Sequence, residues 1–362
     1  NDFARIYYVP ARYSPIFDKR YRIIMPWQYM NGGSLIREIM LKERPDLVEV
    51  TDKYTLSMMG AMIRINKFKQ IGRPILVHFS CERMDDNVGS FLVGGRAGEW
   101  FARQIIAKST LPSFDFHIAN SVYTAEEFHL SVRKTGGLMR RTWRWLKAPR
   151  VELADRVFVC PRGVDAVQFT PDRKSEAGRA KLLELSGIPK DAFAILYAGR
   201  ISPEKNVGLL IEMMKEVAGD GGRDFRLVVA GAGPQEEWLR AEGEKLGQNK
   251  VVLLGHRDKD TLADLYANAD VFVHPNPKEP FGIAPLEAMA SGVPTVAPRA
   301  GGILSYATDE NAWLLPPEGK AFADAVRSIA DDPEAAKLRS AEAVETARAN
   351  TREASTQRLF DT

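Results

Sequence analysis

Cysteine is scarce in this chain of 362 residues, and its scarcity excludes several classes of protein. Cys81 and Cys160 are the two cysteines, and they stand far apart in the sequence. They cannot build a disulfide framework, and they offer no clustered ligands for a structural zinc ion. Such cysteine usage is typical of a reducing compartment, so we expect a cytoplasmic protein.

Long apolar runs are also missing. No stretch approaches the roughly 20 apolar residues of a membrane-spanning helix, and no secretory signal opens the chain. Hydrophobic residues make up 45% of the chain and charged residues 27%, as in ordinary soluble proteins. Because 362 residues exceed what one core usually organises, the length predicts two α/β domains.

The most informative stretch that is present runs from residue 270 to residue 297. Residues 270–275 are apolar and short enough for a buried strand, residues 284–291 predict a helix that Gly292 ends, and 293–297 predict the next strand. The loop Glu279-Pro280-Phe281-Gly282 therefore lies at the carboxyl end of a strand and leads into a helix. In an open α/β sheet, ligands bind at such a place, and free amides at a helix start favour an anion.

The residue types of this loop suit a nucleotide sugar. Amides near Phe281, Gly282 and Ile283 can approach a phosphate, because glycine leaves room for the backbone. Glu279 could accept hydrogen bonds from sugar hydroxyls, and Glu287 could bind a ribose diol. Taken singly, each glutamate is more readily explained as a loop residue or as a partner of the helix dipole.

The whole segment resembles the signature of retaining glycosyltransferases of family 4, also called glycosyl transferases group 1. The resemblance covers most of residues 194–317. It implies an α/β GT-B fold, in which two Rossmann-like, doubly wound domains face each other across a cleft. It also implies that Glu279 contacts the transferred sugar and that Glu287 contacts the ribose.

Other donor-site candidates follow the strands of the same domain. Arg200 and Lys205 come after the strand that ends at Gly199, and one guanidinium with one ammonium suits a diphosphate. Gly231 predicts a tight turn against the nucleotide, and the resemblance places His256 and Arg257 beside the base. Asp258-Lys259-Asp260 is formally a metal-binding Asp-x-Asp, but its place before a helix is explained by capping, so we expect no metal.

The first domain offers weaker candidates. His78 lies near the end of a predicted strand, and the resemblance implies that it points into the cleft on the acceptor side and assists catalysis. A lone histidine is more often structural. Ser121 ends another predicted strand on the same side. The glycine-rich acceptor loop of the family is not recognisable, which suggests that the chain begins after it. We expect domains at 1–165 and 166–340, with 341–362 a helix that returns to the first domain.

Charge is distributed unevenly. Residues 1–165 carry 26 Lys and Arg against 17 Asp and Glu, whereas residues 166–362 carry 24 against 30. Residues 131–150 hold seven basic residues, no acidic residue and two tryptophans. This mixture suits an anionic membrane surface, and equally a solvated helix whose tryptophans pack on their own domain. It would also suit nucleic acid, but no nucleic-acid-binding motif accompanies it, and we expect no such partner.

The sequence thus predicts metal-independent transfer of a hexose, with retention, from a UDP- or GDP-hexose to a hydroxyl of a lipid or glycan. The product would be an α-glycoside, and no cofactor beyond the donor substrate is expected. The catalytic residues would be His78, Glu279, Arg200 and Lys205. Two alternatives stay open: a sugar-nucleotide hydrolase or epimerase of the same fold, and a non-catalytic nucleotide-sugar-binding protein.

Overall fold

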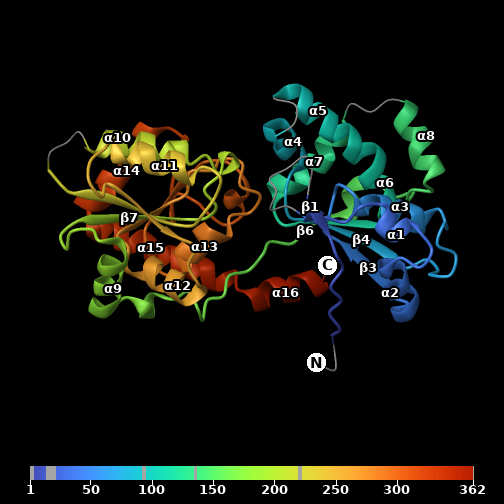
Figure 1. Ribbon diagram of the computed structural model, residues 1–362, viewed down its shortest axis with the longest axis horizontal. Coiled ribbons are helices and arrows are strands. Elements are labelled where there is room, and N and C mark those ends of the chain that lie inside the picture. Colours follow the sequence, from blue (N-terminus) through green and yellow to red (C-terminus); the bar gives the residue numbers. More distant parts are fainter. Residues whose placement is uncertain (1–3, 14–21, 92–94, 134–136, 219–221, 362) are drawn as a thin grey trace. The chain divides into compact units, whose positions relative to one another are not determined.

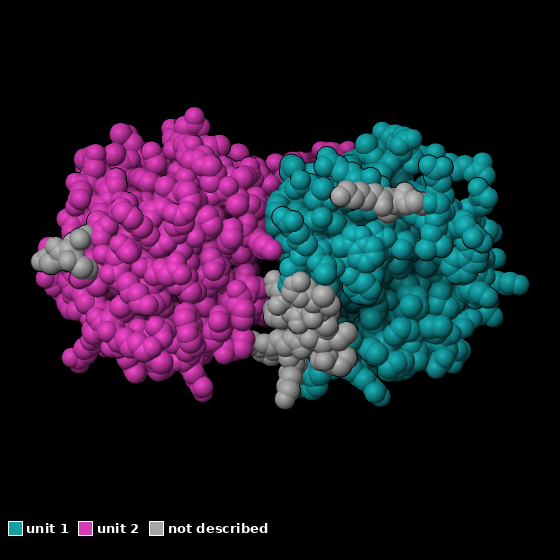
Figure 2. Space-filling view, turned by 90° about the horizontal axis from the view of Figure 1, so that it is seen from above, with its two compact units in different colours: residues 1–160 teal, residues 161–362 magenta. Residues whose placement is uncertain are grey.

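The computed structural model describes residues 4–13, 22–91, 95–133, 137–218 and 222–361. The chain divides into two compact units, residues 1–160 and residues 161–362, which Figure 2 colours separately. The sequence predicts the domain boundary after residue 165, five residues later than the boundary between these two units. Each unit is described by itself.

Unit 1 contains a parallel sheet of four described strands in the order β3-β4-β5-β6 (Figure 1). The strands are β3 (Leu47–Val50), β4 (Ile75–Ser80), β5 (Phe116–Ala119) and β6 (Val157–Val159), and β1 (Arg12–Tyr13) pairs separately with β2 (Arg22–Ile23). The helices are α1 (Trp27–Met30), α2 (Leu35–Glu43), α3 (Leu56–Arg64), α4 (Met84–Phe91), α5 (Arg96–Ile105), the π-helix η1 (Ile106–Thr110), α6 (Leu111–Ser113), α7 (Val122–Val132), α8 (Gly137–Trp145) and the 3₁₀ turn η2 (Leu153–Arg156).

The two faces of this sheet differ in burial. Val48 pairs with Leu76 and Val50 with His78, and these side chains point to the face that α3, α6 and α7 cover. Leu47 and Ile75 pair on the opposite face, where they are 52% and 49% exposed. Because side chains alternate along a strand, the second face is the less covered of the two in the described residues.

Unit 2 contains a parallel sheet of six described strands in the order β12-β11-β10-β7-β8-β9. They are β7 (Phe193–Ala198), β8 (Phe225–Ala230), β9 (Val251–Gly255), β10 (Val271–Val273), β11 (Thr295–Pro298) and β12 (Trp313–Leu315). Around them lie η3 (Pro171–Arg173), α9 (Glu176–Ser186), η4 (Pro203–Lys205), α10 (Gly208–Ala218), α11 (Glu236–Glu244), α12 (Lys259–Asn268), α13 (Ile283–Ala290), η5 (Gly302–Ser305), α14 (Gly319–Asp331), α15 (Pro333–Ala349) and α16 (Arg352–Asp361).

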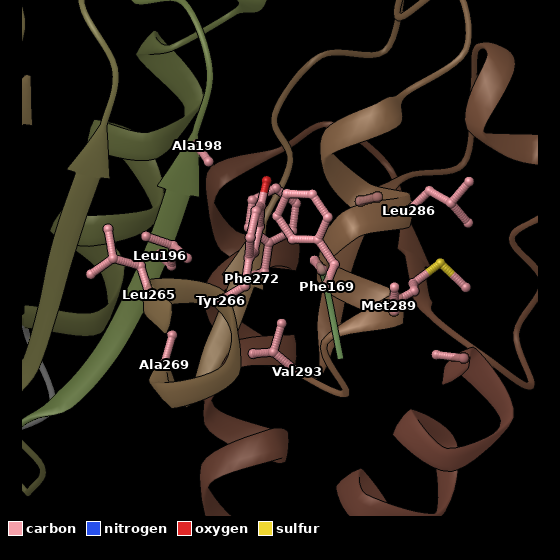
Figure 3. Close-up of a cluster of buried hydrophobic side chains, with 14 of the residues drawn as sticks. Phe169, Leu196, Ala198, Leu265, Tyr266, Ala269, Phe272, Leu286, Met289 and Val293 are labelled. Atoms are coloured by element: carbon pink, nitrogen blue, oxygen red, sulfur yellow. The ribbon is translucent and has the colours of Figure 1, made fainter. Parts of the chain in front are cut away.

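Both faces of the unit 2 sheet are buried, each beneath its own apolar cluster. Leu196 and Phe272 belong to the cluster that Figure 3 shows, together with Tyr266 of α12 and Leu286 of α13. Ile195 and Val229 face the other way, into a cluster with α10 and α14. Strands of a parallel sheet that is covered on both faces are continuous apolar runs. Such runs are easily recognised, so the strands of this domain could be predicted from the sequence.

The last segment of the chain is attached to unit 2. Residues 341–349 continue α15, which packs against α13 and α14. Ser355 of α16 donates to the carbonyl of Pro161, and Arg352 pairs with Asp165 at 3.1 Å. The expected return of this segment onto the first domain stays a prediction.

Candidate nucleotide-sugar site

The candidate donor residues of unit 2 follow the carboxyl ends of its parallel strands. The chain builds β7, β8 and β9 outward in one direction and then places β10 on the other side of β7. The strand order therefore reverses between β7 and β10, and ligands of open α/β sheets bind at such a point. Arg200 and Lys205 follow β7, and Glu279 follows β10. The two loops that were predicted to bind the donor therefore flank this switch point.

An ion pair joins these two loops. The ammonium of Lys205 lies 2.7 Å from Oε2 of Glu279, and the same oxygen accepts from the amide of Asn276 at 3.1 Å. Asn206 donates to the carbonyl of Pro275 at 3.0 Å and links the same loops again. Burial raises the pKa of the Glu279 carboxyl, but Lys205 and the other donors around it outweigh burial and lower the pKa overall. Glu279 is therefore held as a carboxylate.

His274 is a residue of this site that sequence reasoning missed. It is 4% exposed, and its Nε2 lies 3.7 Å from Oε2 of Glu279 with no hydrogen-bond partner. Burial lowers the pKa of His274 to about 4, so the ring is neutral near pH 7. The available signal was its position directly before Pro275, at the end of a strand that leads to the signature loop.

Arg200 is arranged differently from Lys205. Its side chain is 35% exposed, and its guanidinium lies 3.7 Å from Oε1 of Glu204, to which the hydroxyl of Ser202 donates at 2.6 Å. Lys205 thus points toward the β10 loop, whereas Arg200 has a contact within its own loop. Both cations are on the carboxyl edge of the sheet, and the structure pairs Lys205 with Glu279.

Close backbone packing shapes the same edge. A Cβ on Gly231 would lie 1.8 Å from the carbonyl oxygen of Gly199, and one on Gly302 would lie 1.9 Å from that of Pro280. Any side chain at either position would therefore push two loops of the site apart. The backbone N–H of Gly302 donates to the carbonyl of Glu279 at 2.7 Å, so residues 301–302 support the signature loop.

The signature loop ends where α13 begins. Gly282 precedes the helix with φ of +89°, a conformation that favours glycine. Phe281 is 3% exposed and packs against Tyr306, with ring centroids 5.2 Å apart, so its side chain belongs to the core and only its backbone can serve a ligand. The side chain of Ile283 is 38% exposed.

Glu287 lies on α13, and the hydroxyl of Tyr266 lies 3.4 Å from its Oε2. Burial raises the pKa of Glu287 to about 7, more than this hydrogen bond lowers it. A half-buried carboxylate for which the described residues show no ion pair is costly, and such sites are often functional.

His256 and Arg257 follow β9. His256 is exposed, and Arg257 donates to the carbonyl of Leu254, while its buried Nε has no partner. Asp258 accepts from the N–H of Thr261 at 2.9 Å, which confirms the capping interpretation of Asp258-Lys259-Asp260. In the described residues, no group of three or more His, Cys, Asp or Glu side chains could hold a metal ion.

The two predicted residues of unit 1 occupy structural positions. The ring of His78 is fully buried between Phe114, Phe128 and His117, and its expected role on the acceptor side stays a prediction. It lies two residues before the strand ends at Ser80, on the covered face. Burial lowers its pKa well below the ordinary value. The hydroxyl of Ser121 accepts from the N–H of Thr124 at 3.0 Å, so it caps α7.

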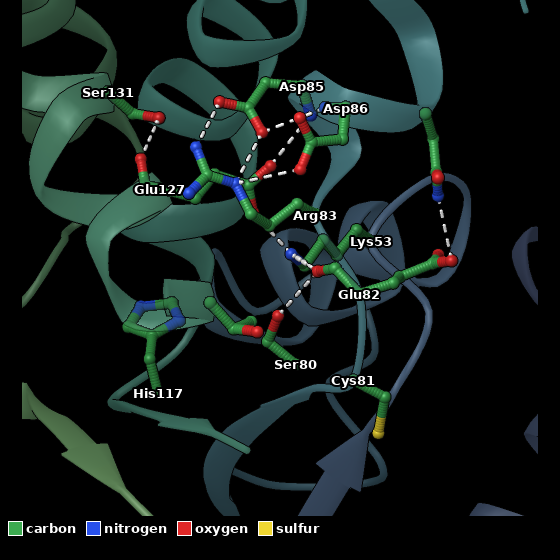
Figure 4. A network of polar contacts seen from close by, with 12 residues as sticks. Lys53, Ser80, Cys81, Glu82, Arg83, Asp85, Asp86, His117, Glu127 and Ser131 are labelled. Carbon is green, nitrogen blue, oxygen red and sulfur yellow. Dashed lines mark hydrogen bonds and ion pairs between the residues drawn. The ribbon is translucent and has the colours of Figure 1, made fainter. Parts of the chain in front are cut away.

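A polar network occupies the carboxyl edge of the unit 1 sheet instead (Figure 4). Lys53 and Glu127 form an ion pair with both side chains fully buried, and Lys53 also donates to the carbonyl of Glu82. Arg83 binds Asp85 in a two-bond contact, at 3.0 and 2.9 Å. Because these charged groups are paired with one another, the network holds the loop after β4 in place.

Two parallel α/β units, with Lys205 and Glu279 paired at the switch point of unit 2, agree with the GT-B fold of glycosyltransferases. Residues 179–347 match the family described as glycosyl transferases group 1. Unit 2 therefore carries a domain of that family, the chain is a glycosyltransferase that uses a nucleotide sugar, and the resemblance to family 4 is confirmed.

Relatives extend this assignment. The chain is 29% identical over 333 residues to a GDP-mannose-dependent alpha-(1-6)-phosphatidylinositol dimannoside mannosyltransferase of Mycobacterium tuberculosis, covering 92% of this chain and 76% of that protein. It is 33% identical to a GDP-mannose-dependent alpha-mannosyltransferase of Corynebacterium glutamicum, over 62% of this chain and 53% of the relative.

Solved structures agree on the fold. The Anabaena protein HepE, in complex with UDP and glucose, superposes with a TM-score of 0.69 at 19% identity and covers 90% of this chain and 80% of its own. Sucrose-phosphate synthase from Thermosynechococcus elongatus superposes with a TM-score of 0.68 at 24% identity, over 90% of this chain and 75% of that one. No helix among the described residues is both long and apolar enough to cross a membrane.

Proposed function

We propose that this glycosyltransferase moves mannose from GDP-mannose to a hydroxyl of a lipid-linked or free glycan, with retention and without a metal ion. The observation that carries the proposal is the contact of Lys205 with Glu279 beside the start of α13. The two relatives described above are GDP-mannose-dependent, which supports GDP-mannose as the donor, and the name of the first supports a glycolipid acceptor.

In this proposal the diphosphate of the donor lies against Lys205, Arg200 and the free amides at the start of α13. Positive charge there stabilises the negative charge that develops on the departing diphosphate. The amides of a helix N-terminus contribute to the same end. Two cations and these amides would do the work that a metal ion does in other transferases.

In this proposal Glu279 accepts hydrogen bonds from the transferred sugar and does not form a covalent bond with it. Lys205 and Asn276 engage its Oε2, and the lowered pKa keeps it as a hydrogen-bond acceptor for hydroxyls. Retention would then come from attack on the same face: the anomeric carbon loses its bond to the diphosphate oxygen and gains one to the acceptor oxygen. The acceptor proton passes to the departing diphosphate. Glu287 would bind the ribose diol, and His256 and Arg257 would lie beside the base.

Nucleotide release tests this assignment. Purified protein is incubated with GDP-mannose or UDP-glucose, with and without a mannosylated phosphoinositide, and with EDTA in a parallel series. The proposal expects GDP release that requires acceptor and survives EDTA. Release without acceptor would instead indicate a hydrolase, and tight binding without turnover would indicate a binding protein.

Lys205→Ala should lower the transfer rate by about 100-fold or more, because it removes one charge-stabilising donor. Lys215→Ala is a suitable control, since Lys215 lies on α10 with its side chain 56% exposed. If the transfer rate of Lys205→Ala stayed within a few-fold of that of the unsubstituted protein, the proposed role of Lys205 in binding the diphosphate would be refuted.

The acceptor side of the proposal includes a membrane surface. On α8, Trp143 faces inward: its Nε1 donates to the carbonyl of Ala107 at 2.7 Å. Leu138 and Trp145, seven residues apart and so on one side of the helix, are 62% and 66% exposed, and Arg141 between them is exposed too. An outward face of one tryptophan, one leucine and arginines suits anionic lipid. Residues 134–136 of this basic segment lie outside the described residues.

Vesicle sedimentation tests the membrane contact. The double variant Leu138→Ala and Trp145→Ala should bind vesicles that contain phosphatidylglycerol about tenfold more weakly, because buried apolar area contributes to interfacial affinity. Trp238→Ala in unit 2, where the indole is 40% exposed, is the matched control. Equal binding by the double variant, or equal binding to neutral vesicles, would contradict the proposal.

A further inference from the structure

A hollow in unit 2 lies at the opposite edge of the sheet from the donor loops. It has a volume of about 730 Å³ and is lined by residues just before or at the starts of β7, β10 and β11, by the end of α14 and by one side of α15. Since β7 is six residues long, the two edges are roughly 20 Å apart. The hollow is therefore separate from the nucleotide-sugar site. Figure 1 shows α15 beneath the sheet, beside α13.

The wall of the hollow contains an unsatisfied hydroxyl. Ser340 of α15 is 6% exposed, and its Oγ has no hydrogen-bond partner. Serines inside helices commonly bond back to a carbonyl one turn earlier, and this one does not. A buried polar atom without a partner is rare in folded proteins, so a hydroxyl on the wall of a hollow indicates an absent acceptor or donor.

Cations surround this hydroxyl. Lys337, one turn before Ser340 on α15, and Lys174 both line the hollow with exposed side chains. The structure shows no ion pair for either ammonium among the described residues. Arg223 contributes a third cation, which donates to the carbonyl of Ala330 and lies over the ring of Phe193.

Most of the acidic groups around the hollow are already neutralised. Asp270 pairs with Arg179 at 3.0 Å and accepts from the N–H of Ala194, and Glu345 pairs with Arg348 at 2.5 Å. Glu334, at the start of α15, is the remaining carboxylate, and it lies where the helix dipole favours negative charge. The free charge of the hollow is therefore positive.

We infer that this hollow binds a small organic anion, with its phosphate or carboxylate group between Lys174 and Lys337 and with the Ser340 hydroxyl as a donor. The apolar side chains of Ile329 and Val344 line the same wall, so the ligand carries a carbon skeleton rather than being a bare ion. The site takes no part in the proposed transfer, and the chain needs no acceptor for the binding to be measured.

Calorimetric titration of the whole chain tests this inference. The probes are glucose 6-phosphate, citrate and inorganic phosphate, each titrated with and without saturating GDP, which is to occupy the donor site. The inference expects glucose 6-phosphate or citrate to bind with GDP present, and to bind more tightly than inorganic phosphate. Competition by GDP would place the anion in the donor site and overturn the inference, as would the absence of binding by every probe.

Variants locate the bound anion. Lys337→Glu and Lys174→Glu should each weaken binding about tenfold or more, because a charge-assisted contact becomes a repulsion. Lys190→Glu is the control with the same charge change, since Lys190 is exposed and does not line the hollow. Ser340→Ala should weaken binding several-fold without altering the charge. An unchanged dissociation constant in both lysine variants, or an equal loss in the control, would overturn the inference.

Discussion

The sheet of unit 2 is covered on both faces, whereas the sheet of unit 1 has one face that is largely buried and one that is less so. Phe272 of β10 is 0% exposed, and its ring lies 5.3 Å from that of Tyr266. Phe116 of β5 is 39% exposed, and the centroid of its ring lies 6.1 Å from that of Phe158. The same residue type in the middle of a parallel sheet thus meets two environments.

The carboxyl edges of the two sheets differ in a second way. In unit 1 the buried charges at this edge are paired: burial would raise the pKa of Asp85, but Arg83 and Arg103 outweigh it and lower the pKa to about 2. In unit 2, Glu287 keeps a raised pKa, and Lys205 reaches across to the next loop. Burial also raises the pKa of Glu127 in unit 1 to about 7, but Lys53 pairs with this carboxyl, whereas the described residues show no ion pair for Glu287.

The largest expected effect compares the stability lost at a covered face of the unit 2 sheet with that lost at the less covered face of the unit 1 sheet. Phe272→Ala should lower the free energy of unfolding of unit 2 by about 3 to 5 kcal/mol, because it leaves a cavity in a closed core. Phe116→Ala should lower that of unit 1 by about 1 kcal/mol, since solvent already reaches the ring. Hydrogen exchange of peptides from each unit measures the two changes. Equal losses would remove the distinction between the sheets.

A smaller effect sharpens the contrast in charge. The pKa of Glu287 is about 7 in the folded chain, above its ordinary value of 4.5, so folding opposes loss of its proton. Below pH 4.5 both states hold the proton and nothing is lost; as the pH rises toward 7, the unfolded chain loses it first and stability falls. Glu287→Gln should therefore be more stable than the unsubstituted chain above pH 7, by about 1 to 2 kcal/mol.

Thermal unfolding between pH 4 and pH 8.5 checks this, and the gain should vanish at the acidic end. Glu287→Gln should also weaken GDP-mannose binding, since an amide accepts from a ribose diol less strongly than a carboxylate does. A variant less stable than the unsubstituted chain at pH 8 would show that Glu287 is structural. That would place it with the paired carboxylates of unit 1.

The fold of unit 2 was predictable because its signals are local. Continuous apolar strands, Gly282 before α13 and Asp258 at the start of α12 each act within a few residues. The loop from Glu279 onward was predictable for the same reason. What the sequence could not show was the partner of Glu279, because Lys205 is 74 residues away and only the β7–β10 neighbourhood brings them together.

Unit 1 was harder to predict because its polar residues serve long-range structure. His78 was expected near the end of a strand with its ring toward the acceptor side, but the alternation of side chains along β4 turns the ring toward Phe114 and Phe128. Nothing near Lys53 in the sequence indicates that Glu127, on α7, would neutralise it. The position of a histidine near a strand end does not by itself tell on which face of the sheet its ring lies.

The smallest effect compares two serine caps. Ser121 caps α7 in unit 1 and is 0% exposed, whereas Ser175 caps α9 in unit 2 and is exposed; each accepts from a backbone N–H at 3.0 Å. Substitution of either by alanine should cost about 1 kcal/mol for the lost cap. Ser121→Ala should cost more, because water cannot reach the N–H of Thr124 that it leaves unpaired. Urea unfolding measures both. If Ser121→Ala were nearly neutral in stability yet impaired transfer, the hydroxyl would serve the acceptor after all, and the carboxyl edge of unit 1 would be functional like that of unit 2.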